Sequence, residues 1–233
     1  MAIPGELVVT DDVPGAFAAR VVQAFHGRPL ESFSIALSGG DTARACYERL
    51  AEGGGTQIDW WKVDVYWGDE RCVPHDDVES NYRLAREALL DRVGAANATH
   101  LMRCNEGPDP YQLRLGDLGQ LDVVHLGLGP DGHVASLFPG STGLDADPGR
   151  LVVMNDDPTG TNPYQRMTLT FAGIARARLV LLTVAGAEKA AALAEVASGD
   201  HLPASRVSGD RVLWLVDPAA ASELPNVPAT TSS

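Results

Sequence analysis

Short apolar runs alternate with segments of helical periodicity along most of the chain. Runs rich in Val, Ile and Leu predict six buried strands, at Glu6–Thr10, Phe33–Leu37, Val63–Trp67, Asp122–Leu128, Leu179–Val184 and Arg211–Val216. Nearby segments with apolar residues at helical spacing predict helices, for example at Asp41–Ala51, Ser80–Leu90 and Ala187–Val196. This alternation requires crossover connections, and it predicts an α/β fold with a Rossmann-like, largely parallel sheet and helices on both faces.

No internal repeat or long linker interrupts the pattern, so residues 1–224 are expected to form a single domain. The segment Arg150–Thr170 departs from the alternation through its Asp-Asp-Pro and Asn-Pro turn signals, and it predicts an added hairpin or a lid. Whether residues 141–165 move over a ligand is left open. The polar, proline-containing tail 225–233 is expected to be disordered.

The net charge of −13 argues against nucleic acid or an anionic membrane surface as a partner. It does not exclude a small anionic substrate, because a few local cations can dominate one cleft. No segment approaches the roughly 20 apolar residues that span a bilayer. The opening MAIPGELVVTDD lacks the basic and apolar regions of a secretory signal, so a cytoplasmic location is expected.

The three cysteines, Cys46, Cys72 and Cys104, are odd in number and scattered, with no C-x-x-C spacing. Neither a disulfide framework nor a structural zinc site is expected, in keeping with a reducing cytosol. The histidines form no H-x-x-H or H-E-x-x-H pattern, so no metal site is expected either.

The first candidate site is Ser38-Gly39-Gly40-Asp41-Thr42, between a predicted strand and a predicted helix. Glycines let backbone N–H groups approach an anion, and the helix N-terminus adds partial positive charge. The alternative is a tight turn in which Asp41 or Thr42 is the N-cap. It is not a Walker A loop, because G-K-[ST] is absent.

The second candidate is Trp67-Gly68-Asp69-Glu70-Arg71, directly after another predicted strand. Arg71 is suited to a bidentate grip on a phosphate, with Asp69 or Glu70 to orient it. The alternative is a solvated loop. The later Glu79-Ser80-Asn81 is expected to supply an N-cap and open the next helix.

The third candidate, Lys189, is one of only two lysines in the chain, with Lys62. It lies in the first turn of a predicted helix, where a cation opposes the helix dipole. A bound anion would remove this conflict, and solvent exposure is the alternative.

The fourth candidate is the segment DVVHLGLGPDGHVASLFPG (122–140), which places Asp131 and His133 two residues apart at the carboxyl end of a predicted strand. Open α/β sheets bind ligands at that edge. The glycines of 127–132 spell G-x-G-x-x-G, but a dinucleotide fingerprint should lie on the first strand of its unit and feed a long helix, and this pattern does neither. A carboxylate that fixes the tautomer of an imidazole indicates acid–base chemistry, whereas a loop histidine that only satisfies backbone groups is the alternative.

Taken together, six segments resemble the 6-phosphogluconolactonase family, close kin of glucosamine-6-phosphate deaminase/isomerase. They occur in family order over most of the chain: LSGGDTA (37–43), WGDERCVPHDDVESNY (67–82), LGLGPDGHVASLFPG (126–140), RMTLT (166–170), AGAEKAAAL (185–193) and LPASRV (202–207).

The resemblance implies a Rossmann-like fold and cofactor-free hydrolysis of 6-phospho-D-glucono-1,5-lactone to 6-phospho-D-gluconate in the oxidative pentose phosphate pathway. It places the catalytic histidine on His133, as general base and then acid. The neighbouring aspartate falls on Asp131, which either orients the imidazole or contacts the substrate. Backbone N–H groups of the glycine turns are candidates for stabilising the oxyanion. The residues that it assigns to the phosphate or to the surroundings of the site are Ser38, Gly39, Gly40, Asp41, Arg71, Lys189, Arg166 and Arg206.

Two other functions remain as alternatives. Amino-sugar phosphate deamination and isomerisation is the nearer alternative. The family with that activity carries a similar turn, but there the turn continues with a glutamate before Pro-Gly, where this chain has Ser136-Leu137-Phe138. The other is a non-enzymatic sugar-phosphate sensor, which would not need Asp131 and His133. The expected partner is a small phosphorylated sugar lactone, and the expected state is a monomer or small homo-oligomer.

Overall fold

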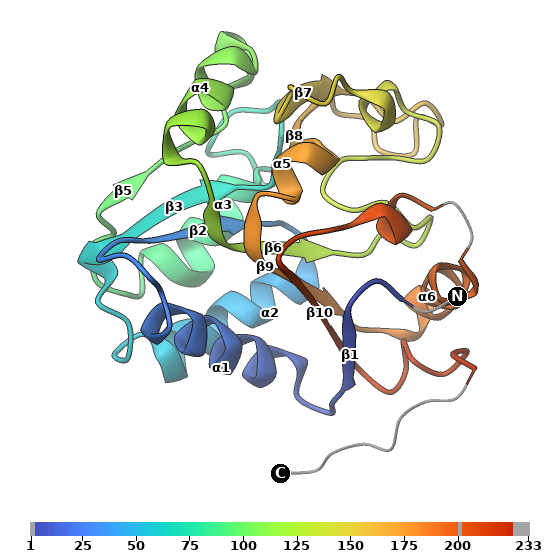
Figure 1. Cartoon of the computed structure of the whole chain (residues 1–233), viewed down its shortest axis with the longest axis horizontal. Helices are drawn as coiled ribbons and strands as arrows, with labels where there is room; N and C mark the ends of the chain where they lie inside the picture. Colours follow the sequence, from blue (N-terminus) through green and yellow to red (C-terminus); the bar gives the residue numbers. More distant parts are fainter. Residues whose placement is uncertain (1–2, 200–201, 226–233) are drawn as a thin grey trace.

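A seven-stranded parallel sheet forms the centre of the protein, in the order β1-β10-β9-β6-β2-β3-β5 (Figure 1). The computed structural model describes residues 3–199 and 202–225. The parallel strands are β1 (Glu6–Val9), β2 (Phe33–Leu37), β3 (Val63–Trp67), β5 (Ala98–Thr99), β6 (Leu121–Gly127), β9 (Ala177–Val184) and β10 (Arg211–Val216). All six predicted strands are present, and their observed bounds differ by at most two residues from the predicted ones.

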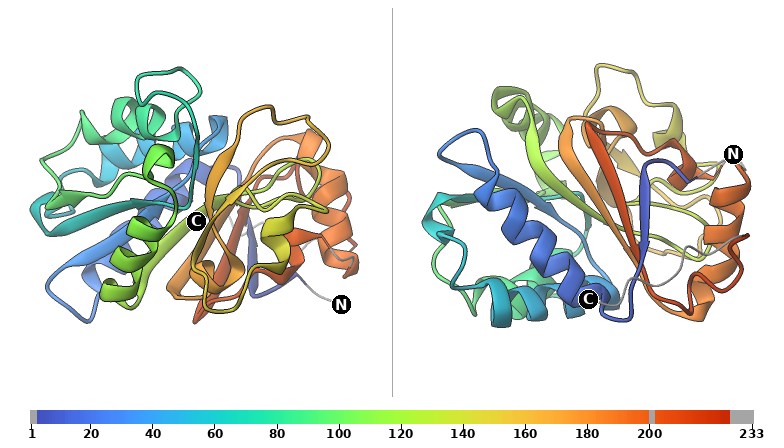
Figure 2. Two further views of the ribbon diagram at one scale, coloured as in Figure 1. Left: turned by 90° about the horizontal axis from the view of Figure 1, so that it is seen from above. Right: turned by 60° about the horizontal axis from the view of Figure 1, so that its bottom comes forward.

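Helices lie on both faces of this sheet, as the alternation predicted. In Figure 1, α1 and α2 lie below the sheet, and α4 and α5 lie above it. In the right view of Figure 2, α1 crosses the sheet while the edge strand β1 lies alongside β10. The helices are α1 (Val13–His26), α2 (Asp41–Arg49), α3 (Asn81–Ala85), α4 (Asp109–Leu118), α5 (Phe171–Ile174) and α6 (Ala190–Ser198).

The burial of β2 and α1 follows from this layering. All five residues of β2 are buried, as expected for a strand covered on both faces. The helix α1 begins after Asp12, whose carboxylate accepts a hydrogen bond from the Gly15 N–H at 2.8 Å. Its buried residues recur at helical spacing and pack on the sheet: Val13, Phe17, Ala18, Val21 and Phe25.

The predicted helical segments are shorter as α-helix than expected. The helices α2 and α3 each continue into one π-helical turn, at Leu50–Gly54 and Arg86–Leu90. The helix α6 is preceded by a 3₁₀ turn at Ala187–Lys189. Such turns keep the apolar spacing roughly helical, so the sequence pattern does not separate them from an α-helix.

A second, antiparallel sheet of three strands forms one wall above the main sheet. Its order is β4 (Asp69–Arg71), β8 (Arg166–Leu169) and β7 (Val152–Asn155). The hairpin predicted within Arg150–Thr170 is confirmed as β7 and β8. The pairing of β4 with β8 joins two segments that lie far apart in the sequence.

The expectation of no disulfide is wrong in this structure, because Cys72 and Cys104 form one, with their Cα atoms 5.5 Å apart. Cys72 lies a few residues beyond β3 and Cys104 a few beyond β5, and these two strands pair in parallel. Neighbouring parallel strands end at the same edge of the sheet, so the two cysteines meet although 32 positions separate them. Cys46 is a free, buried thiol.

Two further findings concern the described part of the chain only. None of its helices is long and apolar enough to cross a membrane. Within the same residues, no group of three His, Cys, Asp or Glu side chains is arranged to hold a metal ion. Most of the tail predicted to be disordered, residues 226–233, lies outside the described residues.

Candidate active site

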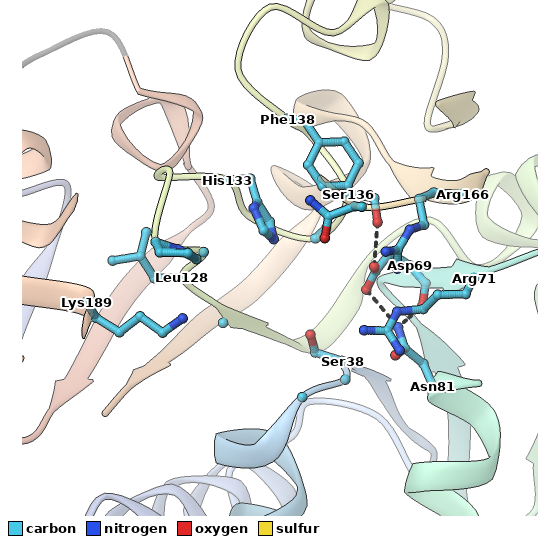
Figure 3. A pocket seen from close by; sticks show the side chains of 17 residues that line it. Ser38, Asp69, Arg71, Asn81, Leu128, His133, Ser136, Phe138, Arg166 and Lys189 are labelled. Atoms are coloured by element: carbon cyan, nitrogen blue, oxygen red, sulfur yellow. Dashed lines mark hydrogen bonds between the residues drawn. The ribbon is translucent and has the colours of Figure 1, made fainter. Parts of the chain in front are cut away.

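A cavity of about 240 Å³ opens at the carboxyl ends of β2 and β6, with the three-stranded sheet as one wall (Figure 3). The candidate motifs were predicted from the sequence to lie at this same edge of the sheet. Six of the seven predicted glycine-loop or cationic positions line the cavity, all except Arg206, and so does His133. The lining residues are Ser38, Gly39, Gly40, Asp69, Arg71, Asn81, Gly127, Leu128, Gly129, Pro130, His133, Ala135, Ser136, Phe138, Asn162, Arg166 and Lys189.

His133 and Asp131 form a hydrogen-bonded pair, with 2.6 Å between His133 Nδ1 and Asp131 Oδ1. Partial burial acts to raise the pKa of Asp131, but the hydrogen bonds and charge of His133 outweigh it and hold that pKa below its usual value. Because Nδ1 is engaged by the carboxylate, Nε2 is the ring nitrogen left for chemistry. Asp131 itself does not line the cavity, but its carboxylate contacts His133, which does.

The glycines around this pair shape the turn that carries it. A Cβ on Gly129 would lie 2.1 Å from His133 Nδ1, so only glycine leaves room for the pair. Gly132 has a φ of +80°, a conformation that favours glycine. The N–H groups of both glycines donate to carbonyl oxygens within the turn, those of His133 and Gly129 respectively. These two N–H groups are therefore already occupied and are removed from the candidates for stabilising an oxyanion.

The Ser38–Gly40 loop presents free backbone N–H groups at the start of α2. The N-cap of α2 is Gly40, with a φ of +91° and no side-chain hydrogen bond, so the alternative of Asp41 or Thr42 as N-cap is wrong. Within the described residues, the N–H groups of Gly39 and Gly40 donate no hydrogen bond. Asp41 is exposed and does not line the cavity. Free N–H groups at a helix N-terminus favour a bound anion.

Arg71 and Arg166 are directly opposite each other across the antiparallel pair β4 and β8. Like charges at opposed positions destabilise a sheet unless an anion lies between them. Arg166 is buried, and burial lowers its pKa, while the carboxylate of Asp69 acts in the opposite direction. Among the described residues, no carboxylate forms an ion pair with Arg166. The two arginines together indicate an anionic ligand.

The carboxylates beside Arg71 act differently from the prediction. Its guanidinium donates to the Glu79 carbonyl and lies 3.8 Å from the Glu79 carboxylate, so Glu79 orients it rather than Asp69 or Glu70. Glu70 is buried and instead accepts from the backbone N–H groups of Arg71, Asn81 and Tyr82. Ser80 is the N-cap of α3, as predicted.

Three residues of the cavity wall did not enter the predicted site as ligands. Asp69 Oδ2 accepts from Ser136 Oγ at 2.6 Å, and Asp69 also accepts from Asn81 Nδ2 through its carbonyl and Oδ1. This buried set joins the turn after His133 to β4 and α3. The only sequence signal for Asp69, Asn81 and Ser136 as site residues was that they belong to the segments WGDER, ESN and ASLFPG.

The last two cations have different positions. Lys189 lines the cavity from the side opposite Arg71 and Arg166 (Figure 3), and no carboxylate in the described chain forms an ion pair with it. Arg206 does not line the cavity: it lies over the Phe171 ring at 4.2 Å and donates to the Leu144 carbonyl. Its segment supports the His133 turn instead, because the Ala204 N–H donates to the Gly132 carbonyl at 3.0 Å.

Fold and site together define an α/β protein with a hydrogen-bonded His–Asp pair beside a cavity lined by two arginines and a lysine, at the carboxyl edge of a parallel sheet. A family model described as "Glucosamine-6-phosphate isomerases/6-phosphogluconolactonase" matches residues 8–214, and the chain belongs to this family.

Its relatives have a consistent name. The chain is 36% identical to a 6-phosphogluconolactonase of Mycobacterium tuberculosis over 91% of each protein. It is 39% identical to a 6-phosphogluconolactonase of Nostoc, over 82% of this chain and 85% of the relative. A solved 6-phosphogluconolactonase from Trypanosoma cruzi superposes with a TM-score of 0.81 at 29% identity, covering 97% of this chain and 99% of that one. These matches confirm the Rossmann-like fold class and the family resemblance.

Proposed function

We propose that this protein hydrolyses 6-phospho-D-glucono-1,5-lactone to 6-phospho-D-gluconate, a step of the oxidative pentose phosphate pathway. The proposal is supported by the 6-phosphogluconolactonases that the chain resembles over most of its length. The single structural observation that carries it is the 2.6 Å contact between His133 Nδ1 and Asp131 Oδ1, with the imidazole on the wall of a cationic cavity.

His133 is the general base and then the general acid of the reaction. Its Nε2 takes a proton from the attacking water as the water oxygen bonds to the lactone carbonyl carbon. When the tetrahedral intermediate collapses, the bond to the ring oxygen breaks and the same proton passes from Nε2 to that oxygen. Asp131 holds the imidazole in the tautomer with its proton on Nδ1, and it stabilises the imidazolium formed between the two steps.

The phosphate of the substrate binds over the Ser38–Gly40 loop. Gly39 and Gly40 line the cavity and their N–H groups are free within the described residues, with Lys189 on one side of the cavity and Arg71 and Arg166 on the other (Figure 3). Binding energy from this remote group positions the lactone carbon beside His133. Asp41 and Arg206, which lie outside the cavity wall, are not given a ligand role.

The residues before Pro139 argue against the deaminase alternative. Ser136 donates to the buried Asp69, and Leu137 and Phe138 are buried apolar side chains, so this segment supplies no carboxylate to the cavity. Glucosamine 6-phosphate is therefore expected to release no ammonia with this enzyme. The cytoplasmic location and the oligomeric state stay predictions.

The test compares wild type with His133→Ala in a lactone hydrolysis assay, each corrected for the spontaneous reaction in a control without enzyme. Hydrolysis above that control is expected to disappear in His133→Ala, while binding of 6-phosphogluconate, measured by calorimetry, is retained. Turnover close to wild type in the variant contradicts the mechanism. Rapid ammonia release from glucosamine 6-phosphate contradicts the proposed function itself, and binding without any turnover by wild type favours the sensor.

A further inference from the structure

A chain of buried polar side chains lies directly beneath the Ser38–Gly40 loop. It runs from the Ser38 backbone to Tyr47 of α2, His125 of β6 and Thr183 of β9. All four residues are at most 5% exposed, and of these only Ser38 lines the cavity. Buried polar groups cost free energy unless they are hydrogen-bonded, and apolar residues would fill the same core without that cost. These hydrogen bonds take no part in the proposed catalytic step, so the presence of polar side chains here needs another explanation.

The distances in this chain are those of good hydrogen bonds. The Ser38 N–H donates to Tyr47 Oη at 2.6 Å, and Tyr47 Oη donates to the Ser38 carbonyl at 3.1 Å. Tyr47 Oη lies 2.9 Å from His125 Nδ1, and His125 Nε2 lies 2.9 Å from Thr183 Oγ1. The tyrosine hydroxyl therefore contacts both polar groups of one peptide residue and one ring nitrogen.

The number of available protons decides which group donates in each of these hydrogen bonds. Burial lowers the pKa of His125 to about 3, so the ring is neutral near pH 7 and carries one N–H. Tyr47 has one proton to donate. If His125 carries its proton on Nδ1, that N–H donates to Tyr47 Oη, the tyrosine proton goes to the Ser38 carbonyl, and Thr183 donates to Nε2. With the proton on Nε2 instead, Tyr47 must donate to Nδ1, and the Ser38 carbonyl loses the only side-chain donor that it has among the described residues.

We propose that Tyr47 and His125 are positioning residues that fix the Ser38 peptide, and through it aim the N–H groups of Gly39 and Gly40 at the substrate phosphate. The inference rests on the proposed function, since it concerns the phosphate end of the same cavity. The Ser38 N–H is itself held by Tyr47 and is not offered to the ligand. The chain also ties together β2, β6 and β9, the three strands that lead into the phosphate loop, the His133 turn and Lys189.

A similar contact at the neighbouring strand shows what is particular about Tyr47. The hydroxyl of Tyr111, on α4, accepts from the Trp67 N–H at 2.7 Å and donates to the Trp67 carbonyl at 3.0 Å, at the end of β3. Both tyrosines thus hold the backbone where a strand ends and a cavity loop begins. Within the described residues, only the Tyr47 hydroxyl also contacts a histidine ring nitrogen. The backbone that Tyr47 holds leads into the loop with the free N–H groups.

The experiment uses Tyr47→Phe, which removes the hydroxyl and keeps the ring, with Tyr66→Phe as the matched control. Tyr66 is a buried tyrosine too, but it lies on β3, its ring stacks on His100, and it does not line the cavity. The readouts are KM and kcat for the lactone, the Kd of inorganic phosphate by calorimetry, and the melting temperature. In Tyr47→Phe we expect KM and the phosphate Kd to rise about tenfold, the effect of about 1.4 kcal/mol, with kcat within about twofold. Tyr66→Phe is expected to leave KM, kcat and Kd unchanged.

A second variant and a spectroscopic measurement complete the test. His125→Leu keeps Tyr47 and is expected to raise the phosphate Kd about threefold, and it carries the test if Tyr47→Phe does not fold. A long-range proton–nitrogen NMR spectrum of wild type is expected to show the His125 proton on Nδ1; a proton on Nε2 overturns the assigned direction of the chain.

The role is overturned if the folded variants melt at lower temperature but keep wild-type KM and phosphate Kd, because the chain would then be structural only. Failure of the proposed function looks different. In that case wild type does not hydrolyse the lactone, yet the difference in phosphate Kd between wild type and Tyr47→Phe still supports the positioning role.

Discussion

His125 and His133 lie eight positions apart on one strand and the turn that follows it, and their surroundings give them opposite chemistry. His125 is fully buried against Phe17 and Tyr47, and its neighbours are neutral hydroxyl groups. His133 is partly exposed on the cavity wall and is held by the carboxylate of Asp131. A buried ring without a counter-charge resists protonation, whereas a ring paired with a carboxylate can take up a proton and return it. The role follows from the partner at Nδ1, a hydroxyl in one case and a carboxylate in the other.

The largest expected effect separates the two histidines directly. We expect His133→Ala to lower kcat by about 10³-fold, within the range for loss of a general acid–base group. His125→Leu is expected to change kcat by less than about threefold, because this ring touches no reacting atom. Steady-state kinetics on the lactone measure both. Equal losses of kcat in the two variants would mean that the contrast between the rings is not catalytic.

A smaller effect is expected when the partner of His133 is neutralised. Asp131→Asn keeps the size of the side chain but removes the charge that orients the ring and stabilises the imidazolium, so kcat is expected to fall about 30-fold with little change in KM. A large rise in KM with unchanged kcat would instead indicate that Asp131 contacts the substrate. Asp147→Asn, at an exposed aspartate that does not line the cavity, is the matched control and is expected to behave as wild type.

The same contrast of one residue type in two settings applies to the arginines. Arg166 lines the cavity opposite Arg71, and Arg206 lies outside it on Phe171. Because a charge-assisted hydrogen bond contributes about 1.5–3 kcal/mol, Arg166→Ala is expected to raise KM about 10- to 100-fold. Arg206→Ala is expected to change KM less than about twofold. If Arg206→Ala produces the larger rise, the cavity described here is not the phosphate site.

The smallest expected effect is on stability against pH. The pKa of His125 is about 3 in the folded protein and near the ordinary 6.5 in the unfolded chain. The unfolded state therefore binds one more proton between these values, and folding stability is present above pH 6.5 and lost as the pH falls towards 3. In His125→Leu the free energy of unfolding is expected to fall less steeply than in wild type as the pH is lowered, by up to about 1.4 kcal/mol per pH unit. Denaturant unfolding at pH 6.5, 5.5 and 4.5 measures the slopes, and identical slopes would contradict the assigned pKa.

The strands and the His133 turn could be predicted because their signals are local. Val63–Trp67 is a short apolar run, and its bounds in the structure are those predicted. The Asp131–His133 pair spans two positions of one glycine turn, so its proximity is already present in the sequence. Glycine at position 129 has a local cause too, since a Cβ there would collide with the pair.

Contacts between distant segments could not be predicted in the same way. Nothing in the residues around Arg71 indicates that β4 pairs with β8, or that Glu79 is its carboxylate partner. The disulfide between Cys72 and Cys104 likewise depends on the parallel pairing of β3 and β5. His125 gave a sequence signal only as a polar residue in an apolar strand, and the hydroxyls that satisfy it come from α2 and β9.

The register of β4 against β8 limits how the length of this chain can change. Arg71 and Arg166 form one of only three residue pairs in this contact, and Glu70 and Met167 form the next, with Glu70 turned away towards the start of α3. Neighbouring residues of a strand face opposite sides, so a one-residue insertion or deletion in β4 would exchange the sides of Arg71 and Glu70. The cavity wall would then carry a carboxylate where it now carries a guanidinium. Insertions and deletions at this point would reverse the charge of this part of the cavity wall while leaving the seven-stranded sheet in place.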